Sequence, residues 1–495
     1  MTRSTGPDDD LLRKVATLFE ETLSQQPPAN IVELWKEHLK IRRVLEEVGA
    51  IQAKLGDTDE RLGKAKRDSS AIDAFLKWAD GVGIARNNVT IGITQSNGFS
   101  LQATSSIPKA HIVARVPRHA MITLDHARKS AMLKKAFERD PIVSGMENVG
   151  LALFLSCQWL SAEKSKWNPY ISVLPTTFPT PLFYSEDQLL NLKPSPIFEE
   201  ALLFYRTISR QYSYFLLAVA KNKMFDNAQN RRNGMEPPIF YNSPFTVENF
   251  TSKLYFWAVG IVTTRVNMVP SESATGQDGK PAIIPALIPV LDMANHENLA
   301  TDTPMEDLVC YSPDEECAVI TSHKDVKSDE EVTIFYGTRS IGEHLLHNGF
   351  VPLHHGKFDV LKLKIGIPKT DKHLGTKLEL VKKLVPSVHA SGNIFHVDLF
   401  NYRTQPFSDD LLQFAAIFVA TEPTEKSITT TELQKKGLEF LKARFSLLTR
   451  SYESSFDASK LQEISVEGDA ARLKRAELEI FKLAFNHCEL LEKSL

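Results

Sequence analysis

Strand-like sequence occurs in two blocks of this chain, and a long helical stretch separates them. Short segments that alternate apolar and polar residues lie between Ile72 and Val116 and return between Ile283 and Tyr336. Residues 125–265, between the two blocks, have mostly the apolar spacing of helices. Two β-rich blocks on either side of a helical insert predict an α+β fold in which one β-rich domain is split.

Helical patterns also occupy both ends of the chain. Segments 10–23 and 29–55 carry apolar residues at helical spacing, and segments 431–449 and 469–491 are amphipathic with mixed charge. A strand is expected at 359–365. We therefore predict an N-terminal helical segment (1–70), a split domain (71–350) whose insert covers about 125–265, and an all-α C-terminal domain (351–495).

Composition excludes several classes of protein. The chain has 495 residues and a net charge of -3, without the concentrated basic surface that nucleic acid requires. No apolar run reaches the roughly 18 residues of a membrane-spanning helix, and no signal-peptide pattern follows Met1. The cysteines form no CxxC pair, which disfavours disulfides and structural zinc and indicates a reducing cytosolic or nuclear setting: they are Cys157, Cys310, Cys317 and Cys488.

Polar residues that could carry chemistry stand at the ends of apolar runs. Residues 289–296 read Pro-Val-Leu-Asp-Met-Ala-Asn-His, and residues 333–337 read Thr-Ile-Phe-Tyr-Gly. Gly98 lies in a turn ahead of a strand, where glycine lets the backbone approach a ligand closely. Arg265, at the end of the helical insert, could meet a carboxylate. Each feature alone is weak, since a buried histidine is most often an ordinary core residue.

Together, and in this order, the motifs resemble SET-domain methyltransferases of the RuBisCO-methyltransferase type. The motifs are Asn97-Gly98-Phe99, Trp167-Asn168-Pro169-Tyr170, Ser209-Arg210-Gln211-Tyr212, Thr264-Arg265-Val266-Asn267, Asp292-Met293-Ala294-Asn295-His296, Phe335-Tyr336-Gly337-Thr338-Arg339 and Asn348-Gly349-Phe350. The resemblance implies a split SET domain, a C-terminal helical domain that binds substrate, and no zinc cluster or other metal. Within that family the chain resembles the branch that methylates a histidine of actin.

The resemblance also implies where S-adenosylmethionine (AdoMet) would bind. The cofactor-binding residues that it indicates are Arg67, Asn97, Gly98, Phe99, Arg265, Asp292, Asn295, His296, Asn348, Gly349 and Phe350. Of these, Gly98 and its neighbours would line the methionine end, and Phe350 would lie near the adenine. Arg67 and Arg265 would approach the carboxylate or ribose side.

By the same resemblance, Tyr336 would sit at the transferred methyl group and Asn267 would face the target side chain. The residues implied for the substrate groove are Arg210, Leu291, Ile334 and Arg339. The implied enzyme is a soluble, monomeric protein-histidine N-tele-methyltransferase with actin as its protein partner and with no nucleic-acid or membrane partner.

Protonation makes histidine a plausible target. Free imidazole titrates near pH ~6.5 and is mostly neutral in the cytosol, whereas lysine, near ~10.4, must first lose a proton at a cost of roughly 4–5 kcal/mol. A histidine enzyme therefore needs to orient the ring more than it needs a base, and an asparagine amide can hold one ring nitrogen. Asn267 is the candidate.

Two positions depart from the histidine branch. Leu291 stands where that branch carries tryptophan, and Asn97 stands where it usually has glutamate. The smaller Leu291 loosens the wall of the substrate pocket, so a lysine methyltransferase acting on a protein other than actin is an alternative. A non-catalytic SET-fold binding module is a further alternative, which the presence of Asn295, His296 and Tyr336 disfavours.

Overall fold

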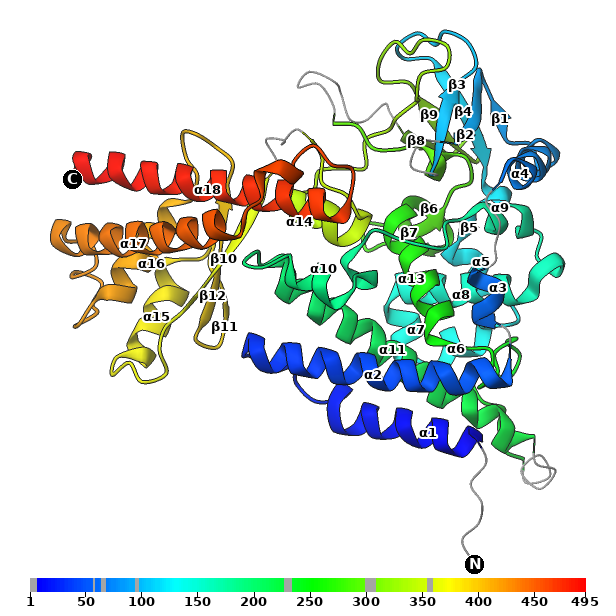
Figure 1. Ribbon diagram of the computed structural model, residues 1–495, viewed down its shortest axis with the longest axis horizontal. Helices are drawn as coiled ribbons and strands as arrows, with labels where there is room; N and C mark the ends of the chain where they lie inside the picture. Colours follow the sequence, from blue (N-terminus) through cyan, green and yellow to red (C-terminus); the bar gives the residue numbers. More distant parts are fainter. Residues whose placement is uncertain are drawn as a thin grey trace, which may run out of the picture. The chain divides into compact units, whose positions relative to one another are not determined.

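The computed structural model describes residues 7–56, 58–63, 68–93, 98–226, 234–298, 309–353 and 359–495 (Figure 1). The chain forms two compact units. The first unit comprises Met1–Phe178 and Leu202–Tyr336, and the second comprises Pro179–Ala201 and Gly337–Leu495. The predicted α+β class is confirmed. One boundary between the two units falls directly after Tyr336.

The N-terminal segment of the first unit is helical, as predicted. Its elements are α1 (Pro7–Leu18), η1 (Phe19–Leu23), α2 (Ile31–Leu55), α3 (Thr58–Gly63) and α4 (Ser69–Gly81). Asn30 starts α2, because its side-chain oxygen accepts hydrogen bonds from the backbone N–H groups of Val32 and Glu33. Helix α1 packs along α2, with which it shares an ion pair between Lys14 and Glu47 at 2.6 Å (Figure 1).

Antiparallel pairing joins the two β-rich blocks across the insert. The strands are β1 (Ala85–Arg86), β2 (Val89–Ile93), β3 (Phe99–Ala103), β4 (Ile112–Pro117), β5 (Ile122–Thr123), β6 (Asn267–Thr275), β7 (Pro281–Leu287), β8 (Val309–Ser312) and β9 (Cys317–Thr321). They form the sheets β1-β4-β9-β8, β2-β3 and β5-β7-β6. Because β4 pairs with β9 and β5 with β7, strands from before and after the insert share sheets, which is the predicted split arrangement.

The insert is helical. Its helices in the first unit include α5 (Leu124–Lys129), α6 (Lys134–Arg139), α7 (Pro141–Gly145), α8 (Glu147–Ser161), α9 (Asn168–Val173), α13 (Ser252–Arg265) and most of α11 (Ile197–Phe225). Helix α13 is buried without interruption from Leu254 to Val262 and packs on α8. A helix that is apolar on all sides belongs in a core. Helix α13 ends at Arg265, and β6 begins two residues later at Asn267.

The second unit combines helices with a small sheet. Its elements are η4 (Pro181–Phe183), α10 (Glu186–Leu190), α14 (Ile341–Glu343), η7 (His344–Asn348), β10 (Val360–Gly366), α15 (Leu374–Leu384), β11 (His389–Ser391), β12 (Ile394–Phe400), α16 (Asp409–Val419), α17 (Thr431–Ser455), η8 (Ala458–Lys460) and α18 (Val466–Ser494). The first turn of α11 also lies in this unit.

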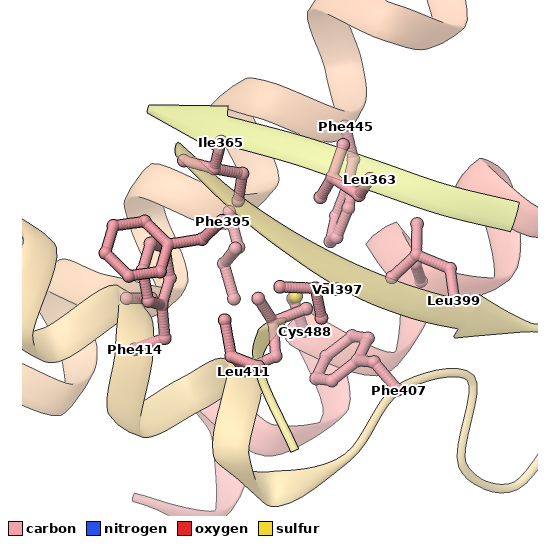
Figure 2. Packing of buried hydrophobic residues seen from close by; sticks show 14 of the residues in the cluster. Leu363, Ile365, Phe395, Val397, Leu399, Phe407, Leu411, Phe414, Phe445 and Cys488 are labelled. Atoms are coloured by element: carbon pink, nitrogen blue, oxygen red, sulfur yellow. The ribbon is translucent and has the colours of Figure 1, made fainter. Parts of the chain in front are cut away.

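The prediction of an all-α C-terminal domain is incomplete, because β10, β12 and β11 form an antiparallel sheet here. The strand expected at 359–365 is β10, and helices α17 and α18 match the two predicted amphipathic helices. Alternate residues of β10 and β12, such as Leu363 and Phe395, point toward the helices, and Phe395 packs against Phe414 of α16 (Figure 2). One face of the sheet is thus buried by helices. None of the helices in the described part of the chain has the length and apolar character that crossing a bilayer requires.

Candidate active site

A strained turn follows β7 and presents the Asp-Met-Ala-Asn-His motif. Val290 has φ 71° and ψ -51°, a conformation that β-branched residues rarely adopt. Its side chain is fully buried, and the 3-10 turn η5 (Leu291–Met293) that follows is also buried. Strain of this kind costs about 1–3 kcal/mol and persists only where surrounding packing holds it. The turn therefore has a fixed shape, and Asn295 emerges from it with an exposed side chain.

Asp292 joins three elements at this turn. Its carboxylate accepts a hydrogen bond from the Tyr170 hydroxyl of α9, and its backbone carbonyl accepts one from the Arg265 guanidinium at the end of α13. Asn267, the first residue of β6, donates from its side-chain amide to the Arg265 carbonyl at 3.2 Å. Burial raises the pKa of Asp292 to about 6, although Arg265 and the Tyr170 hydroxyl both favour its charged form.

The second motif segment lies between β3 and the first motif. The backbone N–H of Val332 donates to Leu101 in β3 at 2.7 Å, so the residues before the motif pair antiparallel with β3. Beyond this point Ile334 donates to Asn295 at 2.9 Å and accepts from Glu297 at 3.0 Å. A parallel bridge therefore joins Ile334 to His296. One segment therefore pairs first with β3, which begins at Phe99, and then with the Asn-His pair.

Tyr336 is fixed against the first motif at both ends. Its backbone N–H donates to His296 Nδ1 at 3.2 Å, and its hydroxyl donates to the Ala294 carbonyl at 2.8 Å. Because the hydroxyl hydrogen is used in that bond, the Tyr336 oxygen can act toward another group only as an acceptor. Since His296 Nδ1 accepts, its Nε2 carries the hydrogen and donates to Asn298 at 3.0 Å.

The structure brings together much of the predicted first-unit set. Hydrogen bonds and strand pairing connect the following residues, with Leu291 buried in the turn itself: Arg265, Asn267, Asp292, Asn295, His296, Ile334 and Tyr336. Turn η5 packs against β3, which begins at Phe99. Arg210 lies on α11 with an exposed side chain and is joined by no hydrogen bond to this group in the described part of the chain.

Six further predicted residues are not part of this first-unit set. Arg67 and Asn97 are outside the described residues. Arg339, Asn348, Gly349 and Phe350 belong to the second unit.

Within the second unit, Arg339 donates to the Asn348 side chain at 2.5 Å. Gly349 has φ 83°, and a β-carbon there would come within 2.9 Å of the Pro179 backbone. The position therefore requires glycine. Phe350 packs against the His344 ring, with the ring centroids 5.1 Å apart.

Tyr170 is a residue of this site to which the sequence assigned no role. It is fully buried, and its hydroxyl holds the Asp292 carboxylate, which lies 122 residues away in sequence. The Trp167–Tyr170 motif marked the segment as part of the family pattern, but the partner of a buried hydroxyl cannot be read from sequence spacing. The fold supplies that information by packing α9 near η5.

Residues 98–337 match the family model of the SET domain, and this range begins at Gly98 and ends directly after Tyr336. The chain is a SET-domain methyltransferase. The match runs from β3 in the first β-rich block through the helical insert to the end of the second block, so the strands from both sides of the insert that share sheets belong to one SET domain. Its substrate is a protein.

Relatives of known name cover nearly the whole chain. The actin-histidine N-methyltransferase of Homo sapiens is 28% identical over 514 residues, which cover 99% of this chain and 78% of that protein. The Gallus gallus protein of the same name is 28% identical, over 98% of this chain and 77% of its own length.

Solved structures show the same fold. The SET domain of LSMT bound to lysine and AdoHcy has a TM-score of 0.61 at 18% identity, covering 86% of this chain and 92% of that one. Rubisco LSMT bound to AdoMet has a TM-score of 0.58 at 18% identity, covering 86% and 93%. As a SET-domain methyltransferase, the chain uses S-adenosyl-L-methionine as its methyl donor.

Polar atoms of Arg265 and Asp292 at the turn fit the amino-acid end of AdoMet. Arg265 Nε and Asp292 Oδ1 are buried and have no hydrogen-bond partner among the described residues. Buried polar atoms of native proteins are almost always paired, so an unpaired donor and an unpaired acceptor in one site indicate a ligand that carries both kinds of group. The carboxylate and ammonium groups of AdoMet have this character, and Arg265 and Asp292 could hold them.

Proposed function

We propose that this methyltransferase modifies a histidine side chain of actin, at the tele nitrogen of the ring. Relatives that align with nearly the whole chain carry this activity in their name. At 28% identity they support the family more strongly than the substrate, so the proposal needs support from the site itself.

The main support for a histidine target is the side-chain amide of Asn267. Its Nδ2 donates to the Arg265 carbonyl, which leaves Oδ1 as the end of the amide that can face a target. Oδ1 has no hydrogen-bond partner within the described ranges, and it can accept from one N–H of a neutral imidazole. The other ring nitrogen then presents its lone pair. Because an imidazole is mostly neutral at pH 7, orientation of the ring replaces deprotonation by a base.

Other residues have supporting roles in this proposal. When bound, the cofactor supplies an electrophilic methyl carbon, and the protein has to place the target nitrogen in line with it and exclude water. The Tyr336 oxygen, restricted to accepting, can make weak C–H···O contacts that fix the direction of the methyl group. Arg265 and Asp292 hold the amino-acid end, and the segments at Gly98 and His296 flank it.

Lysine is the alternative target, and Leu291 is the observation that favours it. The residue is fully buried in the strained turn, and it is smaller than the tryptophan expected of a histidine enzyme. A pocket wall with less aromatic surface would accommodate a long alkyl chain as well as a flat ring.

Transfer of tritium from labelled AdoMet separates the two targets. We expect purified actin to accept the label on a histidine, mapped by mass spectrometry, and an actin peptide with that histidine replaced by lysine to accept much less. Asn267→Ala should lower histidine transfer by about tenfold, the value of one hydrogen bond to the target, while AdoMet affinity changes little. Preferred labelling of the lysine peptide, or an Asn267→Ala enzyme with full activity on actin, would reject the histidine assignment.

We place the enzyme in the cytosol, where actin is available, with the nucleus as a further compartment. All four cysteines, Cys157, Cys310, Cys317 and Cys488, are free thiols, as expected of a protein in a reducing compartment.

A further inference from the structure

The second unit contains a cavity of about 240 Å³ that is separate from the residues of the proposed active site. It lies between the first turn of α11, the α14 turn, the sheet strands β10 and β12, and α18. Aliphatic side chains such as Ile341, Leu361 and Ile480 form its walls and are almost completely buried. With about 30 Å³ for each water molecule, the cavity has room for a ligand of several heavy atoms.

Asp359, directly before β10, is a buried carboxyl group in this cavity without a matching cation among the described residues. The residue is only 4% exposed. Its Oδ1 accepts from the backbone N–H of Ile341 at 3.3 Å, whereas its Oδ2 has no hydrogen-bond partner among the described residues. Neither carboxylate oxygen is part of an ion pair in the described ranges. Burial of a carboxylate costs several kcal/mol unless a cation and hydrogen-bond donors compensate it, so Asp359 favours a positively charged ligand.

The rest of the cavity is lined mainly by acidic residues. Four further carboxylates line it, against a single lysine: Glu200, Glu343, Asp398 and Glu477, with Lys362. Glu477 accepts hydrogen bonds from the hydroxyls of Ser195 and Tyr452, both at 2.8 Å, and Glu343 caps α14 through Ser340. These two groups therefore have local partners, and Oδ2 of Asp359 remains as the buried acceptor atom without one among the described residues.

A metal ion does not fit this arrangement. Calcium needs six to eight oxygen ligands within about 2.6 Å, and magnesium needs a near-octahedral set. No three acidic, histidine or cysteine side chains come close enough together to hold a metal in the described part of the chain. The carboxylates are spread around an aliphatic space, which suits a larger cation with an apolar stem.

We propose that this cavity binds an organic cation, an ammonium or guanidinium group on a short alkyl chain, with Asp359 as its counter-ion. The alkyl chain would lie along Ile341, Leu361 and Ile480, and the cation would reach Asp359 Oδ2. A free diamine and the side chain of a lysine or arginine in a protein partner share this chemistry.

Binding at this site is coupled to proton release. Burial raises the pKa of Asp359 to about 7, and Glu479 adds to the rise, while the Ile341 N–H and the Asn401 side chain work in the opposite direction. The titratable groups around it are Glu200 on α11, Glu343 on α14, Lys362 on β10, Asp398 on β12, and Glu477 and Glu479 on α18. A bound cation favours the charged carboxylate, so near pH 7 the site loses part of a proton when it fills.

Isothermal titration calorimetry on the full chain tests the site with 1,5-diaminopentane and with Nα-acetyl-lysine amide. Pentane-1,5-diol, which has a similar length and no charge, is the control ligand. We expect both cations to bind saturably and the diol not to bind. At pH 7 the heat should depend on the ionisation enthalpy of the buffer. Binding of the diamine alone would indicate a free amine, and comparable binding of the lysine amide would indicate a protein side chain.

Asp359→Asn should weaken cation binding by about tenfold or more and remove the buffer dependence. The free variant should remain folded with an unchanged or higher Tm, because the substitution removes a buried charge that has no counter-ion. Glu422→Gln, on an exposed residue of the same unit, is the matched control and should bind normally. Glu200→Gln changes a second carboxyl group that lines the cavity. It should also weaken cation binding, and it replaces Asp359→Asn as the test if that variant fails to fold.

Equal binding of the diol, undiminished binding in both lining variants, or no saturable binding would overturn the proposal. None of these results depends on methyl transfer.

Discussion

At the scale of single residues, the Tyr336 hydroxyl links the two motifs, since it donates to the Ala294 carbonyl at 2.8 Å. Tyr336→Phe removes that bond and the oxygen acceptor that we place beside the methyl group. Together these are worth about 1.5–2 kcal/mol, so we expect kcat to fall by about tenfold or more while the Kd for AdoMet changes little. Rapid-quench methyl transfer and calorimetry measure the two quantities. Tyr402→Phe, on an exposed tyrosine, is the control. Unchanged turnover in Tyr336→Phe would remove the residue from the mechanism.

Tyr170 acts through another residue, because its hydroxyl supports the Asp292 carboxylate. Tyr170→Phe removes a donor that favours the charged form of Asp292, whose pKa is about 6, and that pKa should rise. AdoMet binding, which we expect to need the charged carboxylate, should then weaken as pH falls, with a midpoint about one pH unit higher than in the wild type.

Calorimetry between pH 5.5 and 8 checks this positioning role. Tyr241→Phe is a matched control, since Tyr241 also donates to a carboxylate, that of Asp226, but at an exposed position of the same unit. A Tyr170→Phe protein that loses stability while keeping the wild-type pH profile of AdoMet binding would show that Tyr170 is structural only.

At the scale of elements, α2 carries a buried histidine that weakens the protein in acid. His38 is 2% exposed, and both ring nitrogens lack hydrogen-bond partners among the described residues. Its ring stacks on Trp35, with centroids 5.5 Å apart, and meets the edge of Tyr205 at 4.6 Å. Burial, with a smaller effect of Arg42, lowers its pKa to about 4. This folded-state pKa lies below the unfolded value, so stability present above pH 6.5 is lost as pH falls toward 4.

His38→Phe keeps the ring packing and removes the titration. We expect the variant to be about 2 kcal/mol more stable than the wild type at pH 5, relative to their difference at pH 7.5. Urea denaturation at the two pH values measures this difference. His111→Gln, on an exposed histidine, should leave the pH dependence as it is. An equal effect of His38→Phe at both pH values would mean that packing, and not charge, controls the site.

Local pattern predicted the elements better than their pairing. Strands β2 and β3 lie within the predicted β-rich block between Ile72 and Val116, and α17 and α18 extend beyond their predicted ranges. Both results follow because period-two and helical spacing are visible in the sequence. The sheet of β10, β11 and β12 was only partly foreseen, since a short buried strand becomes a sheet through partners about 30 residues away. The left-handed Val290 and the bond from Tyr170 to Asp292 depend on tertiary packing, which outweighs the local preference of a β-branched residue.

At the scale of the whole molecule, each unit contains at least one buried carboxyl group whose pKa is raised. In the first unit the pKa of Asp292 is about 6, and in the second unit those of Asp359 and Glu477 are about 7 and about 8. For each carboxyl group the folded-state pKa exceeds the unfolded one, so its contribution to stability is present in acid and is lost as pH rises through the folded value. The buried His38 has the opposite dependence, but its effect ends near pH 6.5. Stability should therefore decline between pH 6.5 and 8.5.

Glu477 gives the sharpest test of this decline, because its folded-state pKa is the highest of the three. Glu477→Gln cannot titrate, and its amide can still bond to the Ser195 and Tyr452 hydroxyls. We expect the variant to gain about 2 kcal/mol over the wild type as pH rises from 6.5 to 8.5, seen as a smaller loss of Tm across a calorimetric pH series. Glu422→Gln, on an exposed glutamate, should follow the wild-type profile. A Glu477→Gln protein whose Tm falls in parallel with the wild type would show that Glu477 is already charged in the native state at pH 6.5, held by its two hydroxyl donors.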